Sequence, residues 1–536
     1  MADIIIVNPR FDISFWGMER CMGTLGRRAN LPVSCLALLA ALVPEEHDVA
    51  IIDENVEEID FDRLGRADMV CLTGMCIQAE RMREILTEVR ARGVMTVVGG
   101  PMATVEPEGI EDLADVLFLG EADFTFPQFV REWSEGRHAS RYKQAEKTDM
   151  TTLPLPRVDL LKADRYMFGS LQISRGCPFT CEFCDIIVTF GRKPRLKTSA
   201  QVLADLDSFR RSGLKIVFVV DDNLIGNKKA IKPILRDIIT WQEAHGYPLT
   251  LFTEASLDLA EDEELMRLMG EAGFQSVFIG IESPNEEALK ETKKLQNVRP
   301  RAGTLIERVH RIQSHGLDVW CGMIVGFDND DVTAFHVLPG FLTESRIANA
   351  LIGLLYAIPT TPLYDRLKSA GRIDAPNAVT YGTNVVPARM NQAEMREGYR
   401  QVMWQVYEPE AYFERIDKLF IEDRFRFVVH HLPYWQKNRW AWVKRLMANY
   451  AKFAGLSARL LSTVKDETLR KVYRRQLARI LFERPGEPHI LFIYAIKVAM
   501  HHHYAAMLVE LHGDKLDVPA AAIPYTASRP AEALLS

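Results

Sequence analysis

Three cysteines stand close together in one short stretch of this chain: Cys177, Cys181 and Cys184. Their spacing, C-x3-C-x2-C, lets three thiolates hold three irons of a cubane [4Fe-4S] cluster. No His or fourth Cys stands nearby, so one iron would stay open for a substrate or cofactor. A zinc knuckle is the alternative, but structural zinc normally takes four protein ligands, and the nearest other cysteines are Cys76 and Cys321.

The cysteines follow a short apolar stretch that predicts a strand at 171–174. Further strands are expected at the spacing of βα units, over 216–220, 249–253, 276–281, 318–325 and 350–357. Helical patterns stand between them, at 199–212, 229–241 and 262–272. Parallel strands with right-handed crossovers predict a partial (β/α)6 barrel over residues 166–370, with active groups at the C-terminal strand ends.

Polar or glycine residues stand at those strand ends. One acid there is often only a helix cap, but such residues after four consecutive strands, opposite a three-cysteine loop, indicate a ligand lining. Acids suit an ammonium group and ribose hydroxyls, and glycines let the backbone approach a ligand closely. The residues are Asp221 and Asp222, Glu254 and Ser256, Glu282 and Ser283, and Gly322 and Gly326.

The N-terminal part, residues 1–140, also alternates strands and helices. Near-continuous apolar strands are expected at 4–7, 49–53, 69–73, 96–99 and 116–119, with helices at 32–42 and 79–92. This pattern predicts a doubly wound, Rossmann-like parallel sheet whose ligand binds beyond the carboxyl ends of the strands. The turns there are Thr73-Gly74, Gly99-Gly100 and Gly120-Glu121. No G-x-G-x-x-G follows the first strand, which weakens a dinucleotide site.

The polar, proline-bearing stretch 141–165 reads as a linker. After the barrel, helices are expected at 392–408, 409–420, 440–453 and 467–482, within a helical domain over 371–516, and the Ala/Pro-rich tail 517–536 is expected to fray. The apolar run 490–500 is too short to span a bilayer and indicates either burial or contact with a membrane or lipid substrate. The adjacent His501-His502-His503 is not a convincing metal site, because consecutive helical residues point in different directions.

Composition excludes some classes of function. The net charge of −7 gives no basic bias for nucleic acid, and the first residues form a strand pattern rather than a signal peptide. No stretch of about 20 uncharged apolar residues predicts a transmembrane helix. Eight Cys without a leader indicate the reducing cytoplasm, where clustered Cys more often mean metal than disulfide.

On these motifs the chain resembles the cobalamin-binding radical S-adenosylmethionine enzymes, and within them the hopanoid methylase-like group. The likeness rests on the cysteine motif with Phe183 before the third Cys, on Gly99-Gly100-Pro101, on Gly120-Glu121-Ala122-Asp123, and on the helical extension around 407–412. The Asp-x-His-x-x-Gly cobalt-ligand motif is absent, and Met102 stands where the family often has His. The resemblance therefore implies cobalamin whose lower face is not held by a protein His.

The resemblance also implies roles for the strand-end residues. Asp221 and Asp222 would contact the amino group of S-adenosylmethionine, Glu254 and Ser256 its carboxylate or ribose, and Glu282 and Ser283 the ribose. The stretch from Gly322 to Gly326 would pass close to the adenine. The cobalamin contacts would come from Thr73, Gly74, Gly99, Gly100, Gly120 and Glu121.

The function that the resemblance implies is C-methylation of an unactivated carbon in a small-molecule or lipid substrate. It would use a 5′-deoxyadenosyl radical and methylcobalamin, with flavodoxin or ferredoxin as electron donor. Two alternatives stay open: a radical cyclase, oxidase or rearranging enzyme with the same cofactors, and a non-catalytic corrinoid or iron–sulfur sensor. The strand-end lining speaks against a sensor, which needs no adenosyl site.

Overall fold

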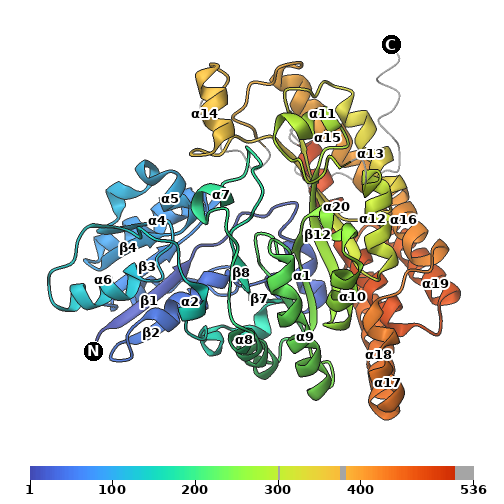
Figure 1. The fold of residues 1–536 in the computed structure, drawn as a ribbon, viewed down its shortest axis with the longest axis horizontal. Coiled ribbons are helices and arrows are strands. Elements are labelled where there is room, and N and C mark those ends of the chain that lie inside the picture. The colour runs from blue at the N-terminus through green and yellow to red at the C-terminus, as the bar shows by residue number, and fades with distance from the viewer. Residues whose placement is uncertain (300–301, 375–381, 514–536) are drawn as a thin grey trace.

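The structure is a computed structural model that describes residues 1–299, 302–374 and 382–513. In these residues the strands form two six-stranded parallel sheets and one two-stranded antiparallel ribbon. Figure 1 shows the N-terminal sheet on one side, the second sheet beside it, and most of the C-terminal helices against the far side of the second sheet. The tail expected at 517–536 lies outside the described residues.

The N-terminal sheet has the strand order β2-β1-β3-β4-β5-β6. Ile5 and Val7 of β1 share a core with α4, and the alternate residues Ile4 and Ile6 share another with α2 and α6. Both faces are therefore covered, as the apolar strands predict, and the doubly wound fold is confirmed. The elements are β1 (Asp3–Asn8), α2 (Ser34–Leu42), β2 (Asp48–Asp53), α3 (Phe61–Leu64), β3 (Met69–Thr73), α4 (Ala79–Ala91), β4 (Met95–Gly99), α5 (Pro101–Val105), β5 (Val116–Leu119), α6 (Thr125–Ser134) and β6 (Arg141–Lys143).

The segment 141–165, expected to be a linker, begins with β6. This strand pairs in parallel with β5 and so extends the N-terminal sheet at its edge. Only Tyr142 of β6 is buried, between exposed Arg141 and Lys143. A three-residue strand carries too little periodicity to be recognised in the sequence.

The second sheet has the sequential order β14-β13-β12-β11-β10-β7, which confirms the partial (β/α)6 barrel. Its first strand ends at Leu171, earlier than expected, because Ser174 and Arg175 leave the sheet and pair as β8 with β9. The elements are β7 (Gly169–Leu171), β8 (Ser174–Arg175), α7 (Ile186–Thr189), β9 (Arg195–Leu196), α8 (Ser199–Ser212), β10 (Ile216–Val219), α9 (Lys228–Ala244), β11 (Thr250–Ala255), α10 (Glu263–Glu271), β12 (Phe274–Glu282), α11 (Glu286–Glu291), α12 (Leu305–Ser314), β13 (Asp318–Val325), α13 (Ala334–Glu344), β14 (Ala350–Leu354) and α14 (Pro362–Ser369).

The C-terminal region is helical: α15 (Gln392–Tyr407), α16 (Pro409–Asp417), α17 (Pro433–Lys437), α18 (Arg439–Thr463), α19 (Glu467–Glu483) and α20 (Pro488–Gly513). The apolar run at 490–500 lies in α20, which packs against α15, α18 and α19. Tyr494, Val498 and Leu508 are fully or almost fully buried. Of the two expectations for this run, the structure shows burial, so contact with a membrane or lipid through α20 is not supported. In the described ranges, no helix has the length and apolar character needed to cross a bilayer.

The residues 9–33 form an N-terminal strap that leaves the first sheet and reaches the C-terminal helices. Its helix α1 (Glu19–Leu25) packs against α20 and α18. The ring of Phe15 stacks on Tyr504, with centroids 5.3 Å apart, and the His503 ring bonds the Ser14 carbonyl at 2.9 Å. The outer two His of the triplet are fully buried, and His501 bonds Tyr473. These two histidines thus support packing.

A buried ion-pair cluster joins the two sheets. Arg175 of β8 donates to Glu121 at 3.0 Å and to Asp123 at 2.5 and 3.1 Å, both just after β5. Arg195 of β9 adds a second cation to Glu121 at 3.0 Å. Burial raises the pKa of Asp123, but Arg175 outweighs it and holds that pKa below its usual value. We name Glu121, Asp123, Arg175 and Arg195 the interdomain ion-pair cluster.

We predict that Arg175→Met lowers the free energy of unfolding by about 3–5 kcal/mol, because it leaves two carboxylates buried without a full counter-charge. Denaturant unfolding of the whole chain measures this. Lys162→Met is the matched control: it removes the exposed interdomain pair with Glu57 and should cost less than about 1 kcal/mol. Adding Asp123→Asn to Arg175→Met should restore part of the loss. Equal costs for the two single variants would contradict the cluster's role.

Candidate active site

The three cysteines lie in a closed loop between β8 and β9. Gly176 has φ +94°, and a Cβ there would lie 2.9 Å from the Gly191 carbonyl, so only glycine fits. The Cys177 amide donates to that same carbonyl at 3.2 Å. Cys181 is buried, while Cys177 and Cys184 are partly exposed. The strand ribbon and the glycine together hold the thiols on one short, fixed loop.

Amide and ammonium groups from other strands face these thiols. Asn223 directs its side-chain amide at the Cys177 sulfur at 3.9 Å, and Gln296 directs its own at Cys181 at 3.5 Å. The Lys294 ammonium lies near Cys181 and Cys184 and pairs with Glu282 at 2.8 Å. Burial lowers the pKa of Lys294, but Glu282 and the thiols outweigh it, so this pKa ends above its usual value. Such N–H donors and a cation suit anionic cluster sulfurs.

Burial raises the pKa of Cys177, and that of Cys184 to about 12. Iron binding would therefore displace protons from these thiols. Among the described residues, no three His, Cys, Asp or Glu side chains are grouped closely enough to hold one metal ion. Thiols that bind three different irons of a cubane need not converge on one point.

Four acids lie around the cysteine loop, and they differ in what they bind. Asp221 accepts from the Ile173 amide and the Ser174 hydroxyl, both at 2.7 Å, and so anchors the start of the loop. Asp222 accepts from the Gly176 amide at 2.7 Å. Glu282 pairs with Lys294 and has φ +68° at a bulge in β12. The structure thus gives Asp221, Asp222 and Glu282 partners within the chain.

Glu254 makes no side-chain hydrogen bond or ion pair within the described residues. Burial, together with the charges of Asp222, Asp221 and Glu282, raises its pKa to about 7. Burial also raises the pKa of Asp221 to about 7 and that of Asp222 to about 6. A partly buried acidic group with too few cations fits a positively charged ligand, as the sulfonium and ammonium of S-adenosylmethionine would be.

Five further residues that the sequence predicts to contact a ligand lie around the site. Ser256 donates to Asp258 and accepts from Asn223 at 3.0 Å, and Ser283 accepts from the Asn285 amide. Gly326 has φ +115°, and a Cβ on Gly322 would lie 3.2 Å from the Phe278 ring. Phe183 lies under Lys294, with its ring centroid 5.8 Å from the ammonium. These residues border the site, and their ligand contacts stay predictions.

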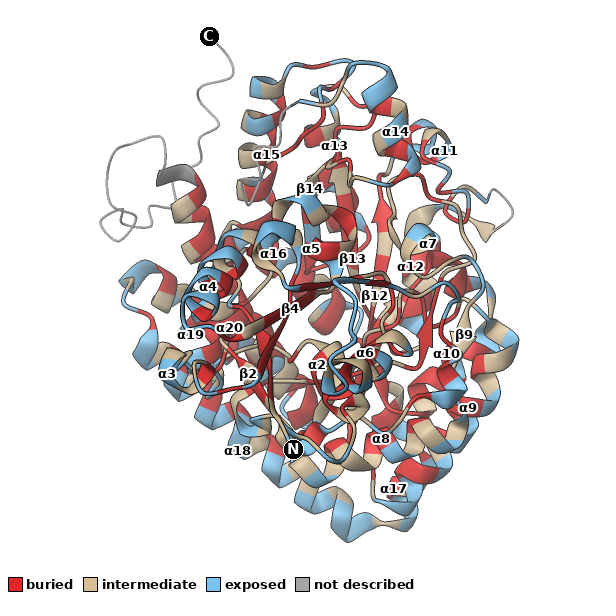
Figure 2. Cartoon of the chain, turned by 90° about the vertical axis from the view of Figure 1, so that its left-hand side faces the viewer, coloured by how far each residue is buried: buried red, intermediate tan, exposed pale blue. Residues whose placement is uncertain are grey.

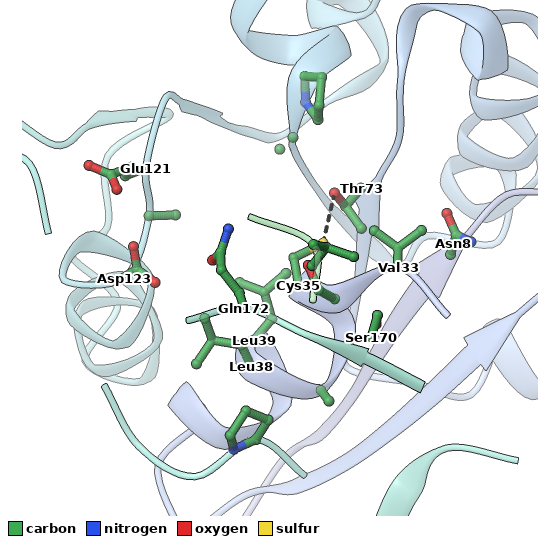
Figure 3. Close-up of a pocket in the computed structure, with 18 of the residues that line it drawn as sticks. Asn8, Val33, Cys35, Leu38, Leu39, Thr73, Glu121, Asp123, Ser170 and Gln172 are labelled. Atoms are coloured by element: carbon green, nitrogen blue, oxygen red, sulfur yellow. Dashed lines mark hydrogen bonds between the residues drawn. The ribbon is translucent and has the colours of Figure 1, made fainter. Parts of the chain in front are cut away.

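A cavity of about 520 Å³ lies between the carboxyl ends of the two sheets. Its wall from the first sheet includes Thr73, Gly74, Gly99, Gly100, Gly120 and Glu121, and its wall from the second includes Gln172, Arg175 and Asp222. Figure 3 shows Thr73 beside Cys35 on one wall and Glu121 with Asp123 on another, with Gln172 between them. The cavity therefore joins the glycine turns to the start of the cysteine loop.

The glycine turns give the cavity a backbone floor. Gly100 has φ +90°, and a Cβ there would lie 2.5 Å from the Thr73 hydroxyl oxygen. Gly120 has φ +76°. None of the described residues lining the cavity is a histidine. The Glu121 carboxylate is engaged by Arg175 and Arg195, and its contact with cobalamin stays a prediction.

Sequence reasoning missed Lys294, Gln296, Asn223 and Arg175. Asn223 directly follows Asp222 and could have been included as a strand-end polar group. Arg175 stands two residues before the first cysteine, but its acidic partners are distant in the chain. Lys294 and Gln296 lie in an irregular segment after α11, where no pattern marks them.

Comparison with protein families divides the chain into three parts. Residues 29–130 match the B12 binding domain, residues 171–336 match the Radical SAM superfamily, and residues 361–515 match a domain of unknown function (DUF4070). The first two ranges contain the glycine turns and the cysteine loop that meet at the cavity.

Two curated proteins are similar over most of their length. The chain is 39% identical over 424 residues to the uncharacterized methyltransferase sll1242 of Synechocystis sp., covering 78% of each chain. It is 33% identical over 420 residues to the hopanoid C-2 methylase of Rhodopseudomonas palustris, covering 77% of this chain and 78% of that one.

Two solved structures share the fold. The cobalamin-dependent S-adenosylmethionine radical enzyme OxsB, with aqua-cobalamin and S-adenosylmethionine bound, superposes with a TM-score of 0.61 at 14% identity, over 98% of this chain and 82% of that one. The radical S-adenosylmethionine methyltransferase TsrM of Kitasatospora setae, with cobalamin and a [4Fe-4S] cluster bound, has a TM-score of 0.56 at 18% identity, over 80% and 87%.

We predict that Cys181→Ala removes most of the iron and acid-labile sulfide from anaerobically reconstituted protein, because the cubane loses one of three protein ligands. It should also abolish 5′-deoxyadenosine in the presence of reductant. Cys76→Ala is the control, since Cys76 lies outside the loop, and it should keep both properties. Persistence of the cluster in Cys181→Ala would show that the ligand assignment is wrong.

We predict that Glu254→Gln weakens S-adenosylmethionine binding to the cluster-loaded protein by about tenfold, equal to about 1.4 kcal/mol. Because the pKa of Glu254 is raised to about 7, its charge is lost as pH falls through that value. Affinity of the wild type should therefore rise with pH across neutrality, and the variant should flatten this rise. Isothermal titration at several pH values measures both.

The control for this experiment is Glu264→Gln, which removes an exposed acid on α10. It should keep the affinity and the pH dependence of the wild type. An unchanged pH profile in Glu254→Gln would exclude Glu254 as the cation-binding group.

Proposed function

Because this chain belongs to the cobalamin-dependent radical S-adenosylmethionine methyltransferases, we propose that it methylates an unactivated carbon of an apolar, polycyclic lipid. Its cofactors are a [4Fe-4S] cluster, S-adenosylmethionine and cobalamin. When bound, they supply a carbon-centred radical oxidant and a transferable methyl group. The chain itself supplies position, charge and exclusion of water.

The observation that carries this proposal is the cavity between the two sheets. Cobalamin at the glycine turns would share this cavity with Asp185, Ile186 and Phe190 of the cysteine loop. The two cofactors would therefore be neighbours, as radical formation and methyl transfer on one substrate require. We propose that Cys177, Cys181 and Cys184 hold the cluster, and that Asp222 and Glu254 hold the cationic end of S-adenosylmethionine. Asp221 and Arg175 position the loop rather than contact the cofactor.

Exposed apolar side chains support a lipid substrate. Met75 and Ile77 project from the loop after β3, and Val188 projects from α7. Met75 and Ile186 of α7 also line the cavity between the two sheets. Apolar side chains from both domains at this cavity suit a hydrocarbon skeleton.

The similarity to the hopanoid C-2 methylase supports the polycyclic class. The matched region covers 77% of this chain and 78% of that protein. A pentacyclic triterpenoid has only aliphatic carbons on its rings, and such carbons need a radical to be methylated.

We predict that reconstituted protein with reductant, cobalamin and S-adenosylmethionine converts a pentacyclic hopanoid to a product heavier by one methylene unit. Mass spectrometry measures the product, and 5′-deoxyadenosine is measured in the same sample. Cys181→Ala protein and a straight-chain hydrocarbon of similar size serve as controls, and neither should give product. Formation of 5′-deoxyadenosine with an unchanged or dehydrogenated hopanoid skeleton would overturn the proposal.

A further inference from the structure

The charge of this protein is distributed unevenly along the chain. Residues 424–484, which contain α17, α18 and α19, carry fifteen Lys and Arg residues and only three Asp and Glu residues. The net charge of this segment is therefore +12, in a chain whose net charge is −7. From Arg424 to Lys465 there is no acidic residue at all. Such asymmetry points to a polyanionic partner.

Large apolar side chains project from the same segment. Trp440, Val443 and Met447 of α18 are 83%, 46% and 63% exposed. Their spacing of i, i+3 and i+7 places them along one side of the helix. The opposite side of α18 is buried through Phe453, Leu456 and Leu460, against the region of α20. The outer side is therefore apolar although nothing within the described chain covers it.

The end of α19 extends this surface. The Tyr450 hydroxyl of α18 donates to the Pro485 carbonyl, which holds the chain just after α19 against the middle of α18. Phe482, in the last turn of α19, is 85% exposed. We name Lys437, Arg439, Trp440, Val443, Lys444 and Met447, together with Phe482, the α18 surface. In Figure 1, α17 and α18 lie at the edge of the molecule opposite α14.

The cations of the α18 surface have no acidic partner in the part of the chain that the structure describes. Lys437, Arg439 and Lys444 make no ion pair among the described residues, whereas Arg424 and Arg426 pair with Glu487. Lys452, on the next turns of α18, lies near the cations Arg445 and Lys215, and burial and these charges lower its pKa. Between Arg424 and Lys465 the chain has no acid to offset these cations, so the charge of this stretch is positive.

We infer that the α18 surface docks this enzyme on an anionic lipid bilayer. The unpaired cations contact lipid phosphates, and Trp440, Val443, Met447 and Phe482 enter the boundary between headgroups and acyl chains. Nucleic acid or an acidic protein would also meet the cations, but neither needs large apolar side chains projecting among them. The bilayer explains both properties of the surface. This inference stands on the surface itself and does not depend on the lipid substrate proposed above.

The test is sedimentation of the full chain with vesicles of phosphatidylcholine, with and without phosphatidylglycerol. The wild type should bind the anionic vesicles, and binding should weaken with salt. The combined change Lys437→Gln, Arg439→Gln and Lys444→Gln should weaken binding by about 100-fold. The matched control, Arg66→Gln with Lys143→Gln and Lys229→Gln, removes exposed cations elsewhere and should bind as the wild type.

A second measurement tests insertion. Lipids with brominated acyl chains should quench part of the tryptophan fluorescence, and Trp440→Phe should remove that quenched part while the other tryptophans keep their signal. Circular dichroism confirms that each variant is folded. Methyl transfer to detergent-dispersed substrate separates this inference from the proposed function, because the cation variants should keep it.

Three outcomes would overturn the inference. The first is equal binding to neutral and anionic vesicles. The second is anionic-vesicle binding that the three cation changes leave intact. The third is binding of duplex DNA or of an acidic redox protein in place of vesicles, lost with the cation changes, which would assign the surface to that partner.

Discussion

The buried guanidinium of Arg175 holds the turn after β5 of the first sheet against the β8–β9 ribbon that carries the cysteine loop. It pairs with Glu121 and Asp123 of that turn and stands two residues before Cys177. Burying a carboxylate or a guanidinium without a counter-charge is unfavourable. Here Glu121 and Asp123 carry two negative charges, and Arg175 and Arg195 carry two positive ones, so the charges of the cluster balance. Because Glu121, Asp123 and Arg175 all line the cavity, this contact fixes the glycine turn after β5 beside the start of the cysteine loop.

Acidic and basic side chains are concentrated in two different places in the molecule. Around the cysteine loop, Asp221, Asp222 and Glu254 are kept in a partly dry environment that raises their pKa values, so the site is prepared for a cation. On the α18 surface, Lys437, Arg439 and Lys444 make no ion pair among the described residues. The net charge of −7 conceals this local excess, because residues 424–484 carry +12 and the rest of the chain −19.

Much of the fold follows from local patterns that the sequence displays. The apolar strands of both sheets and the glycine turns were predictable, because buried parallel strands and positive-φ glycines leave clear signals. The bonding of Asp221 within the loop and the capture of Glu121 by Arg175 were not, because each depends on a partner far along the chain. Lys294 and Gln296 were missed for the same reason, and β6 and β8 because two or three residues carry no period. The C-terminal apolar helix was ambiguous in sequence, since burial and lipid contact require the same composition, and only packing distinguishes them.

The N-terminal strap packs against a helix that is synthesised much later than the strap itself. Phe15 and α1 are made among the first residues, but their partners Tyr504 and α20 are among the last described ones. At 5–20 residues per second, a ribosome would deliver α20 roughly half a minute to a minute and a half after the strap. During that interval the apolar face of α1 has no partner, and the first sheet can fold while its strap stays loose. The strap can therefore take its packed position only once α20 has been made.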